Sequence, residues 1–158
     1  MAESKQQFES ILHMEHIAFD QLTFQRQGFG DKNNKTEFQF EVGIGKEKVT
    51  AENREAPNEH YRVTLAVQAV RKTEFTATVR LSGYFAIDKH IDHKDILLKQ
   101  NAVAILFPYV RSEFTLLTSQ PETHPIVLPA MNIVEMMKNA KEETPSNEKN
   151  NSETESSK

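Results

Sequence analysis

Apolar and polar residues alternate along roughly the first half of the chain, which is the pattern of β-strands that bury one face. The clearest case is the run from Glu37 to Ile44, where phenylalanine and aliphatic residues take every second position. The pattern predicts four consecutive strands, over residues 11–27, 37–44, 61–69 and 75–87. Consecutive strands of this kind predict an antiparallel meander with one covered face.

The first predicted strand contains an irregularity. Ile17 and Phe19 share one parity, whereas Leu22 and Phe24 share the other. A slip of one residue at positions 20–21 would return all four side chains to a single face. The sequence therefore predicts a β-bulge at this point.

The spacing of the apolar residues changes after the fourth strand and becomes helical. A long helix is expected over residues 101–119, with Pro108 inside it. Because proline lacks a backbone N–H and clashes with the preceding turn, this helix must bend or restart there. A proline-rich loop over residues 119–125 follows, and a last helix is expected from near Pro129 to near Ala140.

These elements predict an α+β fold: a four-stranded antiparallel sheet (meander) covered on one face by a kinked long helix and a C-terminal helix. The ordered domain is expected over residues 11–140. Residues 1–10 are mostly polar and are expected to be flexible, and residues 141–158 have no aliphatic or aromatic side chain, which predicts a disordered tail. The free edges of the sheet point to self-association.

The composition argues against several classes of function. The chain has 158 residues and a formal net charge of −4, which argues against nucleic-acid binding by phosphate neutralisation. It has no cysteine, which excludes disulfides, thiolate metal sites and cysteine nucleophiles. It has no apolar stretch of membrane-spanning length and no secretion signal, so we expect a cytoplasmic protein with no membrane insertion.

Candidate catalytic groups are few. His90 and His93 are three residues apart near aspartates, a spacing that a metal site could use, but no third ligand cluster and no HExxH motif accompany them. We interpret them as surface histidines and keep a small metal-dependent enzyme as an alternative. The glycines of residues 43–46 end a strand and lack the spacing of a phosphate loop. Nothing in these patterns supports catalysis, so we predict a protein that is not an enzyme.

The aromatic residues carry more information. Phe29 lies between two glycines in the predicted loop 28–35, where a ring is difficult to bury, and such a ring suits loose contact with apolar peptide segments. Methionines on the expected last helix fit the same role or pack on the sheet: Met131, Met136 and Met137. For other aromatic residues of the strands a core position is the simpler interpretation: Phe38, Phe40 and Phe85.

Three strings in this order resemble the SecB family of export chaperones. The first is Phe75–Ile87, which is similar to the fourth strand of that family. The others are Ile105-Leu-Phe-Pro-Tyr-Val-Arg111 in the long helix and Leu128-Pro-Ala-Met-Asn-Ile133 after it. The resemblance covers roughly residues 11–140.

The resemblance implies an ATP-independent chaperone that holds unfolded client polypeptides, such as preproteins for export, in apolar surface grooves. It also implies a homotetramer built as a dimer of dimers, with no catalysis and no cofactor. The groove would be formed by the end of the first strand, loops 28–35 and 119–130, and the last helix, while residues 104–113 serve as scaffold. The candidate client-binding residues are Phe24, Phe29, Phe38, Phe40, Tyr84, Leu128, Met131 and Met136.

One departure from the family concerns its partner. In the export chaperones, acidic residues on the outer face of the sheet dock the SecA translocation motor. The matching positions here are uncharged: Gln21, Gln25, Thr76 and Thr78. Because carboxylates steer docking to a basic partner, their absence puts SecA docking in doubt. The alternative function is a dedicated chaperone for one partner, such as the antitoxin of a toxin–antitoxin system.

Overall fold

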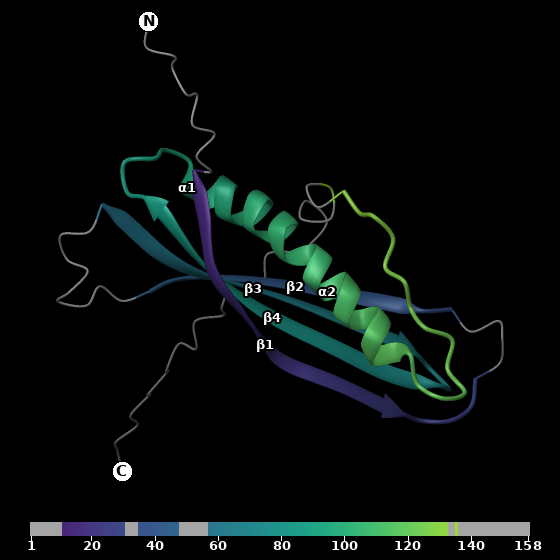
Figure 1. The fold of residues 1–158 in the computed structure, drawn as a ribbon. Helices are drawn as coiled ribbons and strands as arrows, with labels where there is room; N and C mark the ends of the chain where they lie inside the picture. The colour runs from purple at the N-terminus through teal and green to yellow at the C-terminus, as the bar shows by residue number, and fades with distance from the viewer. Residues whose placement is uncertain (1–10, 31–34, 48–56, 133–134, 136–158) are drawn as a thin grey trace, which may run out of the picture.

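A computed structural model describes residues 11–30, 35–47, 57–132 and 135 (Figure 1). It contains four strands, a short helix that passes through a π-helical turn into a long helix, and an irregular segment that returns along the long helix. The elements are β1 (Leu12–Arg26), β2 (Glu37–Lys46), β3 (Asn58–Arg71), β4 (Phe75–Asp88), α1 (Lys94–Leu97), η2 (Leu98–Ala102) and α2 (Val103–Thr118). The four-stranded antiparallel sheet and the helical layer predicted from the sequence are confirmed.

The strand order is β1-β4-β3-β2, with every neighbouring pair antiparallel. Strands β2, β3 and β4 form the predicted meander. The first strand, however, pairs with β4 and not with β2. The described parts of the β1–β2 loop (residues 27–36), which are residues 27–30 and 35–36, therefore lie at opposite edges of the sheet, at the end where β3 turns into β4.

Strand β1 is interrupted twice. The pairing with β4 shifts between Phe19 and Gln21, which confirms the bulge predicted there. A second shift lies between Met14 and His16 and was not predicted. Each extra residue reverses the side-chain parity, so the apolar residues of β1 stay on the face that the helix covers.

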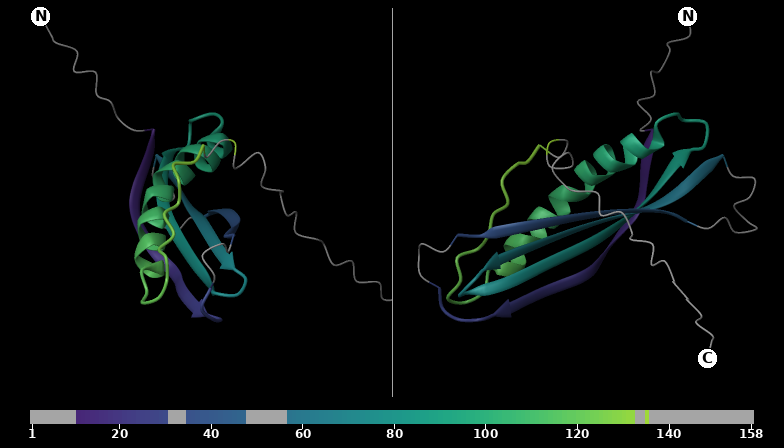
Figure 2. Two further views of the ribbon diagram at one scale, coloured as in Figure 1. Left: turned by 90° about the vertical axis from the view of Figure 1, so that its right-hand side faces the viewer. Right: turned by 180° about the vertical axis from the view of Figure 1, so that it is seen from behind.

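The core lies between α2 and the central strands, and Figure 2 shows the helix on one side of the sheet. Strands β3 and β4 turn every second side chain towards it. The helical segment contributes a row of side chains at every fourth position. Its buried members are Leu98, Ala102, Leu106, Val110 and Phe114. A spacing of four residues exceeds one α-helical turn, so such a row slowly winds around an α-helix. The π turn at η2 holds more residues per turn, and it therefore keeps Leu98 and Ala102 on the same face as the later members of the row.

Pro108 does not end the helix, because α2 continues through it to Thr118. Proline leaves the carbonyl of Ala104 without its helical donor. Both Ala104 and Pro108 are exposed, so water can satisfy that carbonyl. The π turn at η2 is the departure from α-helical geometry in this segment.

The predicted last helix is not seen at its expected start. Residues 129–132 have no helical structure, and most of the remaining stretch to Ala140 lies outside the described residues, as do residues 1–10 and 141–158. Instead, residues 119–132 run back along α2 (Figure 1). Ile126 and Leu128 from this segment are buried in the core.

Candidate functional site

Phe29 is the starting point of the site, because its side chain is 77% exposed. The loop that carries it is held against the β3–β4 turn: the backbone N–H groups of Gln27 and Gly28 donate to the carbonyl oxygen of Glu74 at 2.8 and 3.2 Å. A Cβ at position 28 would lie 2.7 Å from the carbonyl oxygen of Thr73, so only glycine allows this approach. The backbone is thus fixed while the neighbouring ring projects outward.

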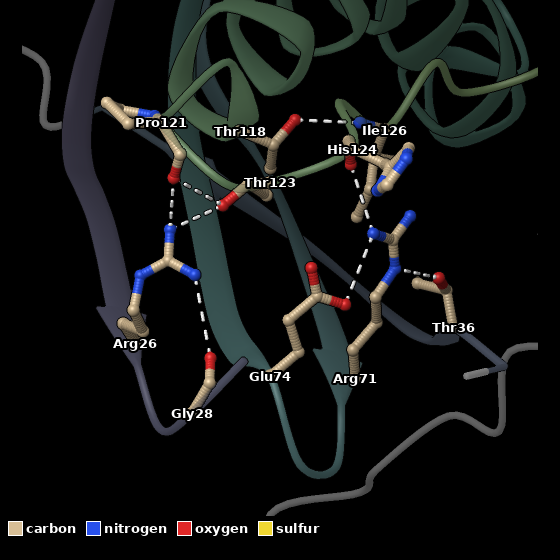
Figure 3. Close-up of polar contacts among 10 residues, drawn as sticks. All are labelled: Arg26, Gly28, Thr36, Arg71, Glu74, Thr118, Pro121, Thr123, His124 and Ile126. Atoms are coloured by element: carbon tan, nitrogen blue, oxygen red, sulfur yellow. Dashed lines mark hydrogen bonds and ion pairs between the residues drawn. The ribbon is translucent and has the colours of Figure 1, made fainter. Parts of the chain in front are cut away.

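Arg26, the last residue of β1, lies beneath this ring. Its guanidinium carbon is 5.2 Å from the centroid of the Phe29 ring and 5.6 Å from that of Phe24. One guanidinium nitrogen donates to the carbonyl of Gly28 at 3.5 Å. The other donates to the carbonyl of Pro121 at 2.7 Å and to Oγ1 of Thr123 at 2.6 Å (Figure 3).

Arg71, at the end of β3, makes a similar set of contacts. Its Nε donates to Oγ1 of Thr36 at 2.8 Å, and a terminal nitrogen donates to the carbonyl of His124 at 3.0 Å (Figure 3). The same nitrogen lies 3.6 Å from a carboxylate oxygen of Glu74, which is itself buried. A hydrogen bond from the amide of Ile126 to Oγ1 of Thr118, at 2.8 Å, closes the segment that both arginines contact.

Phe38 and Phe40 lie at the same end of the sheet on β2. Their side chains are on the face that the helix covers, with ring centroids 6.3 Å apart. The long helix packs chiefly over β4, β3 and β1, so β2 is covered less well. Phe38 remains 36% exposed and Phe40 is half-buried. These rings are thus partly accessible core residues.

Four other predicted residues have different surroundings. Phe24 is half-buried against Phe75, with ring centroids 5.0 Å apart. Leu128 is buried in the core. Tyr84 lies on the opposite face of the sheet, stacked on His16 with centroids 4.2 Å apart, so it does not share a surface with the other candidates. Met136 lies outside the described residues.

Met131 borders a groove that the sequence did not reveal. The groove has a volume of about 780 Å³ and lies between α2 and the returning segment. Its lining is mostly apolar, with three polar residues among nine. The lining residues are Ala104, Phe107, Pro108, Arg111, Ser112, Thr115, Leu116, Ala130 and Met131. Five of these nine residues belong to the stretch 104–113, which was interpreted as scaffold.

The outer face of the sheet is polar and its charges are paired. The register places the four uncharged positions of the predicted motor-docking surface together on this face: Gln21, Gln25, Thr76 and Thr78. The charged groups among them face one another, with Arg80 at 3.2 Å from Glu41 and Arg62 at 3.5 Å from Asp20.

The far end of the sheet carries a strongly perturbed carboxylate. Glu59 accepts hydrogen bonds from Nζ of Lys94 at 2.8 Å, Nζ of Lys46 at 2.9 Å and Oη of Tyr61 at 2.8 Å. These bonds, Lys94 first among them, lower the pKa of Glu59 from 4.5 to about 2. The cluster ties β2 and β3 to α1 and is a structural contact.

His90 and His93 are exposed in the turn before α1. Within the described ranges, no group of three or more histidine, aspartate or glutamate side chains could hold a metal ion. In the same ranges, no helix is long and apolar enough to cross a membrane.

The family model described as SecB, preprotein translocase subunit SecB, matches residues 12–144. Among curated proteins, the uncharacterized protein MJ0357 of Methanocaldococcus jannaschii is 32% identical over 96 residues, covering 57% of this chain and 61% of that protein. The chain thus spans about three fifths of the length of this relative.

Two solved structures are similar in fold. One is the Mycobacterium tuberculosis SecB-like chaperone Rv1957 in complex with a ChAD peptide from the HigA1 antitoxin Rv1956. It has 13% identity and a TM-score of 0.54 over 76% of this chain and 90% of that one. The other is a protein of unknown function from Streptococcus agalactiae, with 17% identity and a TM-score of 0.55 over 75% of this chain and 97% of that one. Because the family match extends over most of the sequence, the chain belongs to the SecB family.

Proposed function

We propose that the protein is a molecular chaperone that holds unfolded polypeptides by apolar contacts, without ATP and without catalysis. Membership of the SecB family supports this function, as does the fold shared with a SecB-like chaperone that was solved with a peptide bound. The observation that carries the proposal is Phe29, a large apolar ring that is 77% exposed on a backbone held in place by hydrogen bonds.

The arrangement suits weak binding at several points. Fully burying one large apolar side chain contributes about 1.5–3 kcal/mol, which ordering of the client largely offsets. A client therefore needs several contacts at once. Phe29 and Phe38 offer contacts at one end of the sheet, and the groove along α2 offers others. Such contacts need no particular client sequence.

We further propose a homotetramer, a dimer of dimers. Apolar side chains at the start of β1, within it and on α2 are exposed in the single chain: Ile11, Phe19, Leu22 and Tyr109. Their burial in an assembly would remove this surface from water. Light scattering should give a mass four times that of one chain, and a stable monomer would contradict the assembly.

The holding function is tested with a chemically unfolded model client. The purified protein, at stoichiometric amounts, should slow aggregation of the client after dilution from denaturant. Phe29→Ala should weaken this effect at unchanged thermal stability. Ile96→Ala is a matched control, because Ile96 is also exposed but lies on α1 at the other end of the sheet. Unimpeded aggregation with the wild-type protein would refute the proposal.

A second candidate is a dedicated chaperone for one partner, such as an antitoxin. The uncharged positions Gln21, Gln25, Thr76 and Thr78 favour it, because a surface without carboxylates there is poorly suited to a basic motor. The antitoxin peptide bound to the M. tuberculosis relative points the same way. Calorimetry should then show weak or no binding to SecA. Equal affinity for many unrelated unfolded chains would argue for general holding of preproteins instead.

A further inference from the structure

Two segments that are distant in sequence meet at one end of the sheet. The first is the pair of described ends of the β1–β2 loop, Gly28–Phe29 and Thr36. The second is the exit loop, residues 119–126, which leads from α2 to the groove-lining Met131. Neither is in regular secondary structure, yet the side-chain contacts that link them to each other reach across 53 to 97 positions of the chain. Two arginines make these contacts.

The arginines divide the task. Arg26 joins Gly28 to Pro121 and Thr123, while Arg71 joins Thr36 to His124 (Figure 3). Each end of the β1–β2 loop is thus tied to the exit loop by one guanidinium.

The exit-loop groups that accept hydrogen bonds from the two arginines are mainly backbone carbonyls. In the exit loop they are the backbone carbonyls of Pro121 and His124, supplemented by one threonine hydroxyl. Bonds to carbonyls fix the path of the backbone whatever the side chains are. A guanidinium has five donors in a rigid fork and can hold two segments at once, which a lysine ammonium cannot reproduce.

We propose that Arg26 and Arg71 form a latch that positions the two client-contacting loops relative to each other, so that Phe29 and the exit loop bind a client as one unit. They are positioning residues for client binding. This inference rests on the proposed holding function. Arg26 has the more direct role, because its guanidinium also lies 5.2 Å from the centroid of the Phe29 ring.

The latch is tested first without a client, by hydrogen exchange on the full-length protein. Arg26→Gln should speed exchange of the exit-loop amides about fivefold, while the amides of β3 and β4 keep their protection. Arg26→Lys should restore little of the wild-type protection of the exit-loop amides. Thr123→Ala is a milder variant that removes one acceptor and should speed exchange in the same direction. Arg80→Gln, an arginine on the outer face of the sheet, should change nothing in the exit loop.

Client affinity is then measured by fluorescence anisotropy of a labelled, permanently unfolded polypeptide. Arg26→Gln and Arg71→Gln should each raise its Kd roughly tenfold, the effect of one charge-assisted hydrogen bond. In a Phe29→Ala background, the effect of Arg26→Gln should shrink, because its main client contact is already gone. The effect of Arg71→Gln should persist there, because Arg71 contacts Thr36 and His124 instead.

The possible results distinguish failure of the holding function from failure of the latch. If the wild-type protein does not bind the client, the holding function fails, and the exchange data still decide whether the latch exists. If the wild-type protein binds but exit-loop exchange is unchanged in both Arg26→Gln and Thr123→Ala, the latch is refuted. Wild-type affinity in Arg26→Gln and Arg71→Gln would also overturn it. If Arg26→Gln lowers the thermal stability, Thr123→Ala replaces it under the same criteria, because Thr123 accepts from Arg26. If Arg71→Gln does so, Thr36→Ala replaces it, because Thr36 accepts from Arg71.

Discussion

Gly83 of β4 faces the long helix at Leu106, and its replacement by alanine tests that contact. A Cβ at this position would lie 2.6 Å from Cδ2 of Leu106 and 2.7 Å from Cε2 of Phe85. Both side chains are fully buried, so neither can move into solvent to make room. The backbone at Gly83 has no positive φ angle, so the cost is one of packing and not of backbone strain.

The magnitude follows from two opposing effects. Overpacking a dense core by one methyl group costs about 1–3 kcal/mol. Replacing a strand glycine by alanine returns about 0.5–1 kcal/mol, because the unfolded chain loses flexibility. We therefore expect Gly83→Ala to lower the free energy of unfolding by about 0–2.5 kcal/mol, and by about 1–3 kcal/mol relative to a strand glycine whose added Cβ meets no atom.

The assay is urea unfolding followed by far-UV circular dichroism at fixed protein concentration, since assembly would make the midpoint depend on concentration. Gly45→Ala is the matched control: it is also a strand glycine, and a Cβ there would meet no atom within 4 Å. It should be neutral or slightly stabilising. If Gly83→Ala were as stable as Gly45→Ala, the helix could not lie against β4 as described.

Three further predictions test the remaining contacts. Glu59 has a pKa of about 2 in the folded protein, so its contribution to stability is fully present above pH 4.5 and is lost as the pH falls through 2. Urea midpoints of Glu59→Gln should therefore be lower at pH 7 and depend less on pH between 4.5 and 2 than those of the wild type. Leu128→Ala should lower the free energy of unfolding by about 2–5 kcal/mol, because Leu128 is buried. Loss of client affinity at unchanged stability would contradict this. Met131→Ala should lower client affinity with little change in the melting temperature, because Met131 is half-buried at the groove; a large fall in melting temperature would mark it as core.

Much of the fold could be predicted from the sequence because apolar residues occupy every second position over residues 61–69 of β3 and 75–81 of β4. The bulge after Phe19 could be predicted because it changes the parity of the apolar residues. The apolar residues change parity in the same way at the second bulge, between Met14 and Ile17. The pairing of β1 with β4 could not be predicted, since alternation indicates which face a strand buries but not which strand lies beside it.

The candidate site was predicted less completely. The exposure of the Phe29 side chain could be predicted, because a ring between glycines has little to bury it. Leu128 could not be recognised as core, because in Ile126-Val-Leu128 all three residues are apolar and the alternation of buried and exposed positions is hidden. The groove is lined by α2 and by Met131, which lies beyond the loop that follows the helix. The hydrogen bond from Arg26 to Pro121 joins residues 95 positions apart. Such contacts depend on the tertiary structure alone.

The order of the strands also has a consequence for synthesis of the chain. Strand β1 ends at Arg26, but its partner β4 is complete only at Asp88. At translation rates of about 5–20 residues per second, the first strand waits roughly 3–12 s on the ribosome for its neighbour. Throughout that interval the apolar side chains of β1, Phe19 and Leu22 among them, have no sheet to join. During this interval the nascent chain exposes the kind of unpaired, apolar segment that chaperones bind.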